Sequence, residues 1–120
     1  MMERKECVEI DPAQFFQQFN LQADRDRHDL IFVVVEDIAR NLGRAETQYL
    51  KTDYDNLRDI LDSVASRAQK FGLRHLSRVA QDVKLCVDEN DLVAVSSTFQ
   101  RLIRVWEQSL FAIWDMPIHS

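Results

Sequence analysis

A chain of 120 residues has the length of a single domain. It holds only two glycines and two prolines, too few for the turns that a β-sandwich or a doubly wound sheet requires. Its content of 46% hydrophobic and 29% charged residues is that of a folded globular protein. The formal net charge of −5 argues against a nucleic-acid partner, because binding to a phosphate backbone depends on clustered lysine and arginine. Composition therefore predicts an all-α domain with no nucleic-acid partner.

The cysteines and the N-terminal residues bear on the compartment of the protein. Cys7 and Cys86 are far apart and match neither a metal-binding spacing nor a disulfide scaffold. The first nine residues are rich in charge and no apolar stretch follows them, unlike a signal peptide. The longest apolar run, residues 30–35, is far shorter than the roughly 20 residues that span a bilayer. We therefore expect a cytoplasmic protein with no membrane partner.

The N-terminal half predicts a short helix and a long one. Asp11 followed by Pro12 is typical of a helix start, with an acceptor side chain at the N-cap and a proline in the first turn. A short helix is expected over residues 13–22. A long helix is expected from about Asp26 to Lys51, because apolar residues recur there in steps of three and four. The recurring residues are Ile31, Val34, Val35, Ile38, Leu42, Ala45 and Tyr49.

The C-terminal half predicts three further helices. Thr52 or Asp53 caps the first of them, Gly72 ends or bends it, and Asn90 or Asp91 caps the last. The side chains expected to face inward are Leu57, Ile60, Leu61, Val64, Ala68, Phe71, Leu76, Val79, Ala80, Val83, Cys86 or Val87, Leu92, Val95, Phe99, Leu102, Ile103, Trp106, Leu110 and Ile113. Short connections make successive helices antiparallel neighbours. The prediction is an antiparallel up-down-up-down four-helix bundle with a short extra N-terminal helix, one domain over residues 11–115 with tails at 1–10 and 116–120.

The sequence carries no pattern typical of an enzyme or a metal site. His28, His75 and His119 are not paired four residues apart, and neither H-E-x-x-H nor C-x-x-C occurs. No glycine-rich loop is present to bind a phosphate. The inward positions of the predicted helices are apolar, which leaves no ligands for a metal in the bundle interior. We therefore expect no catalytic residues, no cofactor and no metal.

A more specific pattern lies in residues 52–76, which read TDYDNLRDILDSVASRAQKFGLRHL. Its informative residues are Asp53, Tyr54, Leu57, Ala68, Phe71, Gly72 and Leu76. The stretch resembles the histidine-containing phosphotransfer (HPt) domains of multistep phosphorelays, whose signature is A-H-x-L-K-G-x-A-x-x-x-G. In element order and length the resemblance extends over residues 26–114. It implies a four-helix bundle and a role in two-component phosphorelay signal transduction.

The chain departs from the HPt signature at the residues that carry the chemistry. Counting back ten residues from Gly72 places Asp62 where the family has its phospho-accepting histidine. Val64, Ala65 and Ser66 stand at the leucine, lysine and first glycine of the motif. A neutral imidazole is a good nucleophile near pH 7. We expect Asp62 to have no acidic pocket, divalent metal or partner lysine to stabilise a mixed anhydride. The resemblance therefore implies a protein that docks signalling partners without accepting phosphate.

The predicted docking face lies opposite the inward stripe of the helix that contains Asp62. It consists of Asp59, Asp62, Ser63, Ser66, Gln69 and Lys70. A solvated polar face is what any bundle helix has, so the resemblance alone singles this one out. The expected partner is a response-regulator receiver domain or a histidine kinase.

Two alternative functions stay open. Phe32, Val33, Phe111 and Trp114 exceed the apolar residues that one bundle needs, which favours a homodimer or a self-associating scaffold. Against this, we expect the phenylalanines of the short first helix to cover Phe32 and Val33. The least favoured alternative is an active phosphotransfer protein that uses another residue. His75 fits poorly, because a phosphoryl acceptor must meet the receiver's pocket in line.

Overall fold

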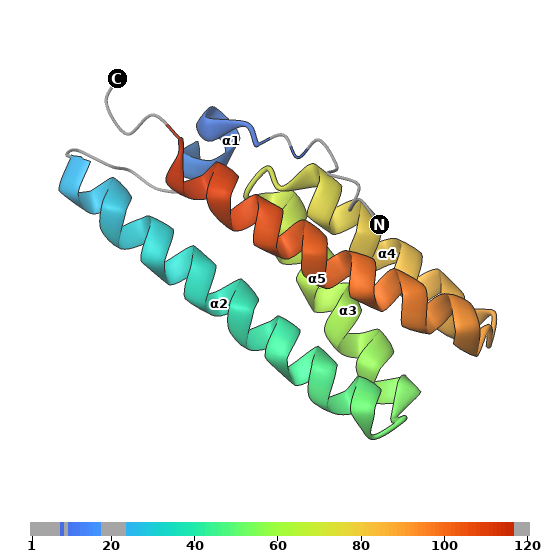
Figure 1. Ribbon diagram of the computed structural model, residues 1–120. Helices are drawn as coiled ribbons and strands as arrows, with labels where there is room; N and C mark the ends of the chain where they lie inside the picture. Colours follow the sequence, from blue (N-terminus) through green and yellow to red (C-terminus); the bar gives the residue numbers. More distant parts are fainter. Residues whose placement is uncertain (1–7, 9, 18–23, 117–120) are drawn as a thin grey trace.

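The computed structural model describes residues 8, 10–17 and 24–116, with only the backbone for residues 24–27. Within these residues the helices are α1 (Pro12–Gln17), α2 (Asp24–Leu50), α3 (Tyr54–Lys70), α4 (Arg74–Asp88) and α5 (Leu92–Trp114). Consecutive helices from α2 to α5 run antiparallel, and α1 lies across one end of them (Figure 1). The prediction of an all-α up-down-up-down bundle with a short leading helix is confirmed. No helix of the described part is long and apolar enough to cross a membrane.

Helices α3 and α4 form the centre of the packing, and each of them lies between two neighbours. Helix α3 lies between α2 and α4, and α4 lies between α3 and α5. Helix α3 packs extensively against both of its neighbours, and α5 packs mainly against α4. The contact between α2 and α5, which closes the bundle, is much slighter. Two aromatic pairs join α2 to α5: Tyr49 stacks on Phe99 with centroids 4.7 Å apart, and Phe32 meets Trp114 edge-on at 5.2 Å. The bundle is therefore tight around α3 and α4 and looser along the seam between α2 and α5.

The three turns between α2 and α5 share one backbone geometry. Each has three residues, and the middle residue, Thr52, Gly72 or Asn90, has a positive φ between 56° and 78°. In each turn two amides donate to carbonyls of the last helical turn, as when Gly72 donates to Gln69 and Leu73 donates to Ala68. This is the Schellman arrangement, which ends a helix and reverses the chain within three residues. The turns therefore impose the antiparallel order.

Aspartate side chains begin most of the helices. Asp11 accepts from the amide of Ala13 at 3.0 Å, which confirms the predicted start of α1. Asp53 caps α3 and Asp91 caps α5, one of the two residues proposed for each position. Among the helices whose N-cap lies in the described residues, α4 is the exception, since its N-cap residue is Leu73 and makes no side-chain cap.

The core agrees with the predicted apolar stripes, with a few corrections. Leu92 was expected to face inward but is 53% exposed, because it lies in the first turn of α5, beyond the end of the packed bundle. Val105 and Ser109 are buried although the periodicity did not include them. Outside the predicted domain limits, Met116 is buried, and the partly buried Ile10 packs against the core, as Val8 does.

The expected cover over Phe32 and Val33 is wrong for the described part of α1. Phe15 is fully buried and packs on Phe71, with 5.9 Å between the ring centroids. Phe32 and Val33 remain 61% and 62% exposed. The other phenylalanine of the predicted first helix, Phe19, lies outside the described residues. Two large apolar side chains of α2 are thus left on the surface.

Replacement of glycine by alanine should change the free energy of unfolding in opposite directions at positions 72 and 43. Gly72 has a φ of +78°, and an added Cβ would lie 3.2 Å from the Cβ of Gln14 and 3.3 Å from the carbonyl oxygen of Asp11. Gly72→Ala should therefore lower the free energy of unfolding by about 1–2 kcal/mol. Gly43 has no neighbour within 4 Å, so Gly43→Ala should raise it by about 1 kcal/mol. Urea denaturation of both variants tests this, and a Gly72→Ala variant as stable as the wild type would contradict it.

Candidate functional site

Helix α3 exposes only the side that α2 and α4 leave uncovered. The buried side of the helix consists of Leu57, Ile60, Leu61, Val64, Ala65 and Ala68. Of the predicted docking face, Asp59, Asp62, Ser66, Gln69 and Lys70 are exposed, and Ser63 is half-buried. The six residues therefore lie on the solvent side of α3, as helical spacing requires.

Asp62 has a lysine partner that the sequence pattern did not reveal. The Nζ of Lys84, on α4, lies 2.8 Å from the Oδ1 of Asp62, and the Asp62 side chain is still 61% exposed. The expectation that Asp62 has no partner lysine is therefore wrong. An exposed pair of this kind contributes only about 0.2–1 kcal/mol to stability. Its larger effect is on charge, because it places a cation beside the exposed carboxylate of Asp62.

Ala65 explains why that cation comes from α4. In the HPt signature the lysine is three residues after the histidine, and here that position is Ala65, which is only 5% exposed. The buried hydroxyl of Ser77 on α4 donates to the carbonyl oxygen of Ala65 at 2.8 Å. Small residues thus bring α3 and α4 close together at this level. A side chain at position 65 points toward α4 instead of standing free beside Asp62.

The predicted face is divided between two shallow depressions that are open to solvent. The first lies between α3 and α4, where its lining includes Asp62, Ser66 and Lys70. The second lies between α3 and α2, where Asp59 and Ser63 contribute. The complete lining of the first is Asp62, Ala65, Ser66, Gln69, Lys70 and Gln81. Four of the six predicted residues therefore share one depression, and the other two belong to its neighbour.

Ser63 contributes to helix packing as well as to the surface. Its hydroxyl accepts from the Nε of Arg67 at 3.2 Å, and Arg67 forms an ion pair with Asp37 of α2 at 3.3 Å. This chain of contacts fixes α3 against α2. The α3–α4 depression is therefore the better candidate for partner contact, since Asp62 and Ser66 have no such link to α2 in the described contacts.

Helix α1 meets the end of this face without covering its centre. The Nε2 of Gln14 donates to the carbonyl oxygen of Gln69 at 2.9 Å, and Arg74 donates to the Oε1 of Gln14 at 3.4 Å. Both contacts are at the C-terminal end of α3, two turns beyond Asp62. Asp62 therefore stays open to a partner.

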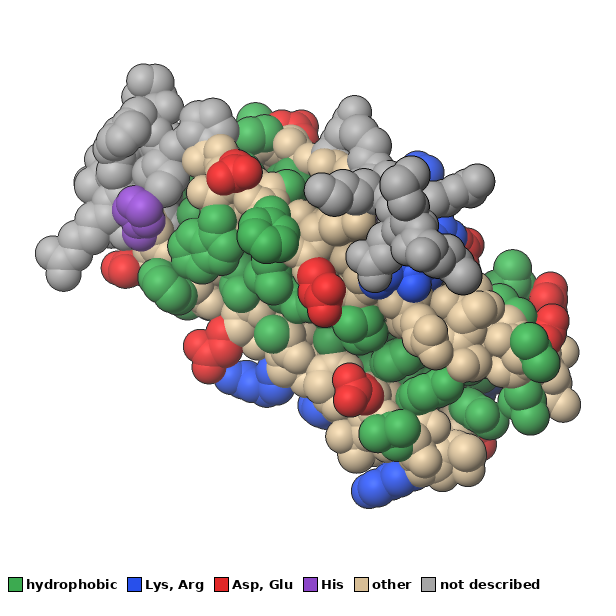
Figure 2. Space-filling model, in the orientation of Figure 1, with side chains coloured by type: hydrophobic (Ala, Val, Ile, Leu, Met, Phe, Trp, Pro, Cys, Tyr) green, Lys and Arg blue, Asp and Glu red, His purple; other side chains and the backbone are tan. Residues whose placement is uncertain are grey.

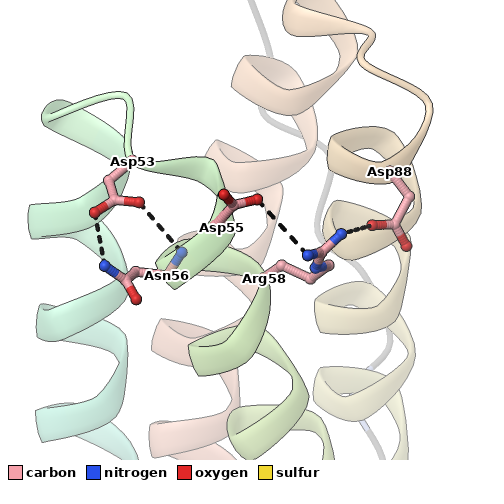
Figure 3. Close-up of polar contacts among 5 residues, drawn as sticks. All are labelled: Asp53, Asp55, Asn56, Arg58 and Asp88. Carbon is pink, nitrogen blue, oxygen red and sulfur yellow. Dashed lines mark hydrogen bonds and ion pairs between the residues drawn. The ribbon is translucent and has the colours of Figure 1, made fainter.

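The opposite end of α3 is clamped by charge (Figure 3). Arg58 pairs with Asp88 of α4 at 3.2 Å and with Asp55 at 3.6 Å. The hydrogen bond and the charge of Asp88 raise the pKa of Arg58 above its ordinary value. On the same turn, Asp53 accepts from Asn56. The pairing of Arg58 with Asp88 holds α3 against α4 at this end.

The histidines do not converge on Asp62. His28 is exposed on α2, and His75 is half-buried in the first turn of α4, beyond Gly72. His119 lies outside the described residues. Among the described residues, no three His, Cys, Asp or Glu side chains are placed to hold a metal ion.

Comparison of the chain with models of known protein families, with curated proteins and with solved structures finds no match.

Proposed function

We propose that this protein is an HPt-like component of two-component phosphorelay signal transduction that binds its partner without accepting phosphate. The partner is a response-regulator receiver domain or a histidine kinase. The contact surface is the α3–α4 depression around Asp62, Ser66, Gln69 and Lys70, with Asp59 and Ser63 at its edge.

The observation that supports this proposal best is the exposed pair of Asp62 and Lys84. A charged pair on the solvent side of α3 offers both an anion and a cation to a docking partner. Ser66, one turn further on, is small and exposed, so that a partner's loops can approach the helix closely. Polar surfaces of this kind fix the orientation of a complex and its rate of formation more than its affinity.

The same surroundings disfavour phosphorylation of Asp62. An aspartate that accepts a phosphoryl group forms a mixed anhydride, and the developing charge needs strong electrostatic stabilisation. Lys84 supplies one cation, but the acidic residue nearest along α3 is Asp59, one turn away, and the depression is open to water. Asp62 therefore functions as a fixed negative charge in the proposed complex.

The proposal predicts binding to receiver domains or kinases encoded in the same genome. We expect a dissociation constant below about 50 µM for at least one of them, measured by calorimetry. Ser66→Arg fills the close-approach position with a long side chain that solvent can accommodate. It should weaken this binding at least about tenfold, equivalent to about 1.4 kcal/mol.

The matched control is Ser97→Arg, which makes the same change at an exposed position of α5. Its affinity should stay within about twofold of the wild type. The absence of any binding at tens of micromolar would refute the proposal. Equal loss in both arginine variants would show that the contact surface lies elsewhere.

A second prediction concerns the missing nucleophile. Asp62→His should accept a phosphoryl group from a phosphorylated receiver, whereas the wild type should not. The imidazole nitrogen forms the new bond to phosphorus, and the bond to the receiver's aspartate oxygen breaks. Lys84, which remains on α4, then stabilises the phosphoryl oxygens. The measurement is the transfer of radiolabelled phosphate from the receiver to the Asp62→His variant and, in parallel, to the wild type.

Label on the wild-type protein would contradict the proposal and favour an active phosphotransfer protein. In that case His75→Ala tests whether the label is on His75. An Asp62→His variant that binds the receiver but stays unlabelled would show that the receiver's pocket does not face position 62.

A further inference from the structure

The outer face of α2 carries apolar side chains at both ends. Phe32 is 61% exposed and Leu50 is 71% exposed. They are 18 residues apart, which is five full turns of an α-helix, so they lie on the same line along its surface. Ala39 and Gly43 lie between them near this line, and both are exposed. The line faces away from α3 and from the core.

This line has an internal symmetry. Phe32 and Leu50 each lie nine residues from Asn41, and Ala39 and Gly43 each lie two residues from it. If a second copy of α2 lies antiparallel to the first with its midpoint at the same level, each Phe32 meets the Leu50 of the other copy. Each Ala39 then meets the Gly43 of the other copy. A two-fold axis requires this kind of self-complementary surface.

We infer that α2 forms the interface of a homodimer, in which two copies of the helix pack antiparallel about the level of Asn41. The surface is separate from the α3–α4 depression, so the inference does not depend on the proposed function.

Gly43 has no role within a single copy that would favour glycine. It lies in the interior of a long helix, where glycine costs about 1 kcal/mol relative to alanine. Its φ is not positive, and no atom lies within 4 Å of where a Cβ would be. In the antiparallel dimer it lies at the point where the helices cross. Small residues there allow the axes to approach to about 8 Å, the short end of the range for packed helices.

The charges of this face permit self-association although the whole chain carries a net charge of −5. Glu36 and Glu46 are balanced by Arg40 and Arg44, and Arg40 already pairs with Glu36 at 3.1 Å. The remaining charged residue of this stretch, Asp37, pairs with α3. The central part of the interface is therefore close to neutral in net charge, although the same register places Glu36 of one copy level with Glu46 of the other.

The apolar area that α2 and the neighbouring end of α5 expose is a substantial part of what a dimer interface buries. Trp114 of α5 packs on Phe32 and is itself 44% exposed, so the apolar end of the face extends across the seam between the two helices. Figure 2 shows hydrophobic side chains gathered over α2 and α5 on this side of the molecule. Together Phe32, Leu50 and Trp114 expose roughly 350 Å² of apolar surface. This is nearly half of the roughly 800 Å² that each partner buries in a stable interface, and the exposed residues between them supply the rest.

Gly43→Arg tests the dimer without endangering the fold. The arginine has free space in a single copy and is a better helix former than glycine. The melting temperature, measured at a concentration low enough for the wild type to be monomeric, should therefore not fall. In the dimer it would separate the two helices where they cross. Light scattering at about 100 µM should give the wild type a mass near twice 14.1 kDa, and Gly43→Arg a mass near 14.1 kDa.

Ser97→Arg is again the matched control, and this variant should remain a dimer. A wild-type protein whose mass stays at 14.1 kDa at this concentration overturns the inference. The occupant of the outer face of α2 would then be a different protein. A folded Gly43→Arg variant that dimerises as strongly as the wild type also overturns it, because a dimer would then form through another surface.

Discussion

The burial of α3 between α2 and α4 is the constraint on which the rest of the structure depends. Six side chains of this helix are buried, and they occupy the flanks as well as the inner side. What remains for solvent is the outer side of the helix, which includes Asp62 and Ser66. The candidate site is therefore a consequence of packing, since only this side of α3 is available to a partner.

The same packing determines where the charge beside Asp62 comes from. Ser77 and Ala65 bring α4 so close to α3 that position 65 is buried, and Lys84 on α4 reaches Asp62 from the neighbouring helix. A lysine one turn along α3 and a lysine across the groove can provide the same electrostatic environment by different routes. The proposed docking surface thus keeps a lysine beside Asp62 although α3 itself has none at position 65.

The fold could be predicted from the sequence because its signals are local. Apolar periodicity marks the long helices, and an aspartate such as Asp53 or Asp91 marks their starts. The pairing of Asp62 with Lys84 could not be predicted, because it depends on the register of two helices, which neither helix encodes alone. For the same reason the sequence does not show which residue Phe15 contacts: its apolar character predicts burial, and the structure places it against Phe71.

The central claim is that α3 and α4 present a docking surface around Asp62, and amide chemical-shift mapping tests it most directly. Isotope-labelled protein is titrated with the receiver domain that binds it best. The account predicts that the largest shifts fall on Asp62, Ser66, Gln69 and Lys84, which line or border the depression. Shifts concentrated on the outer face of α2, or a titration that leaves the α3 amides unchanged, would contradict it.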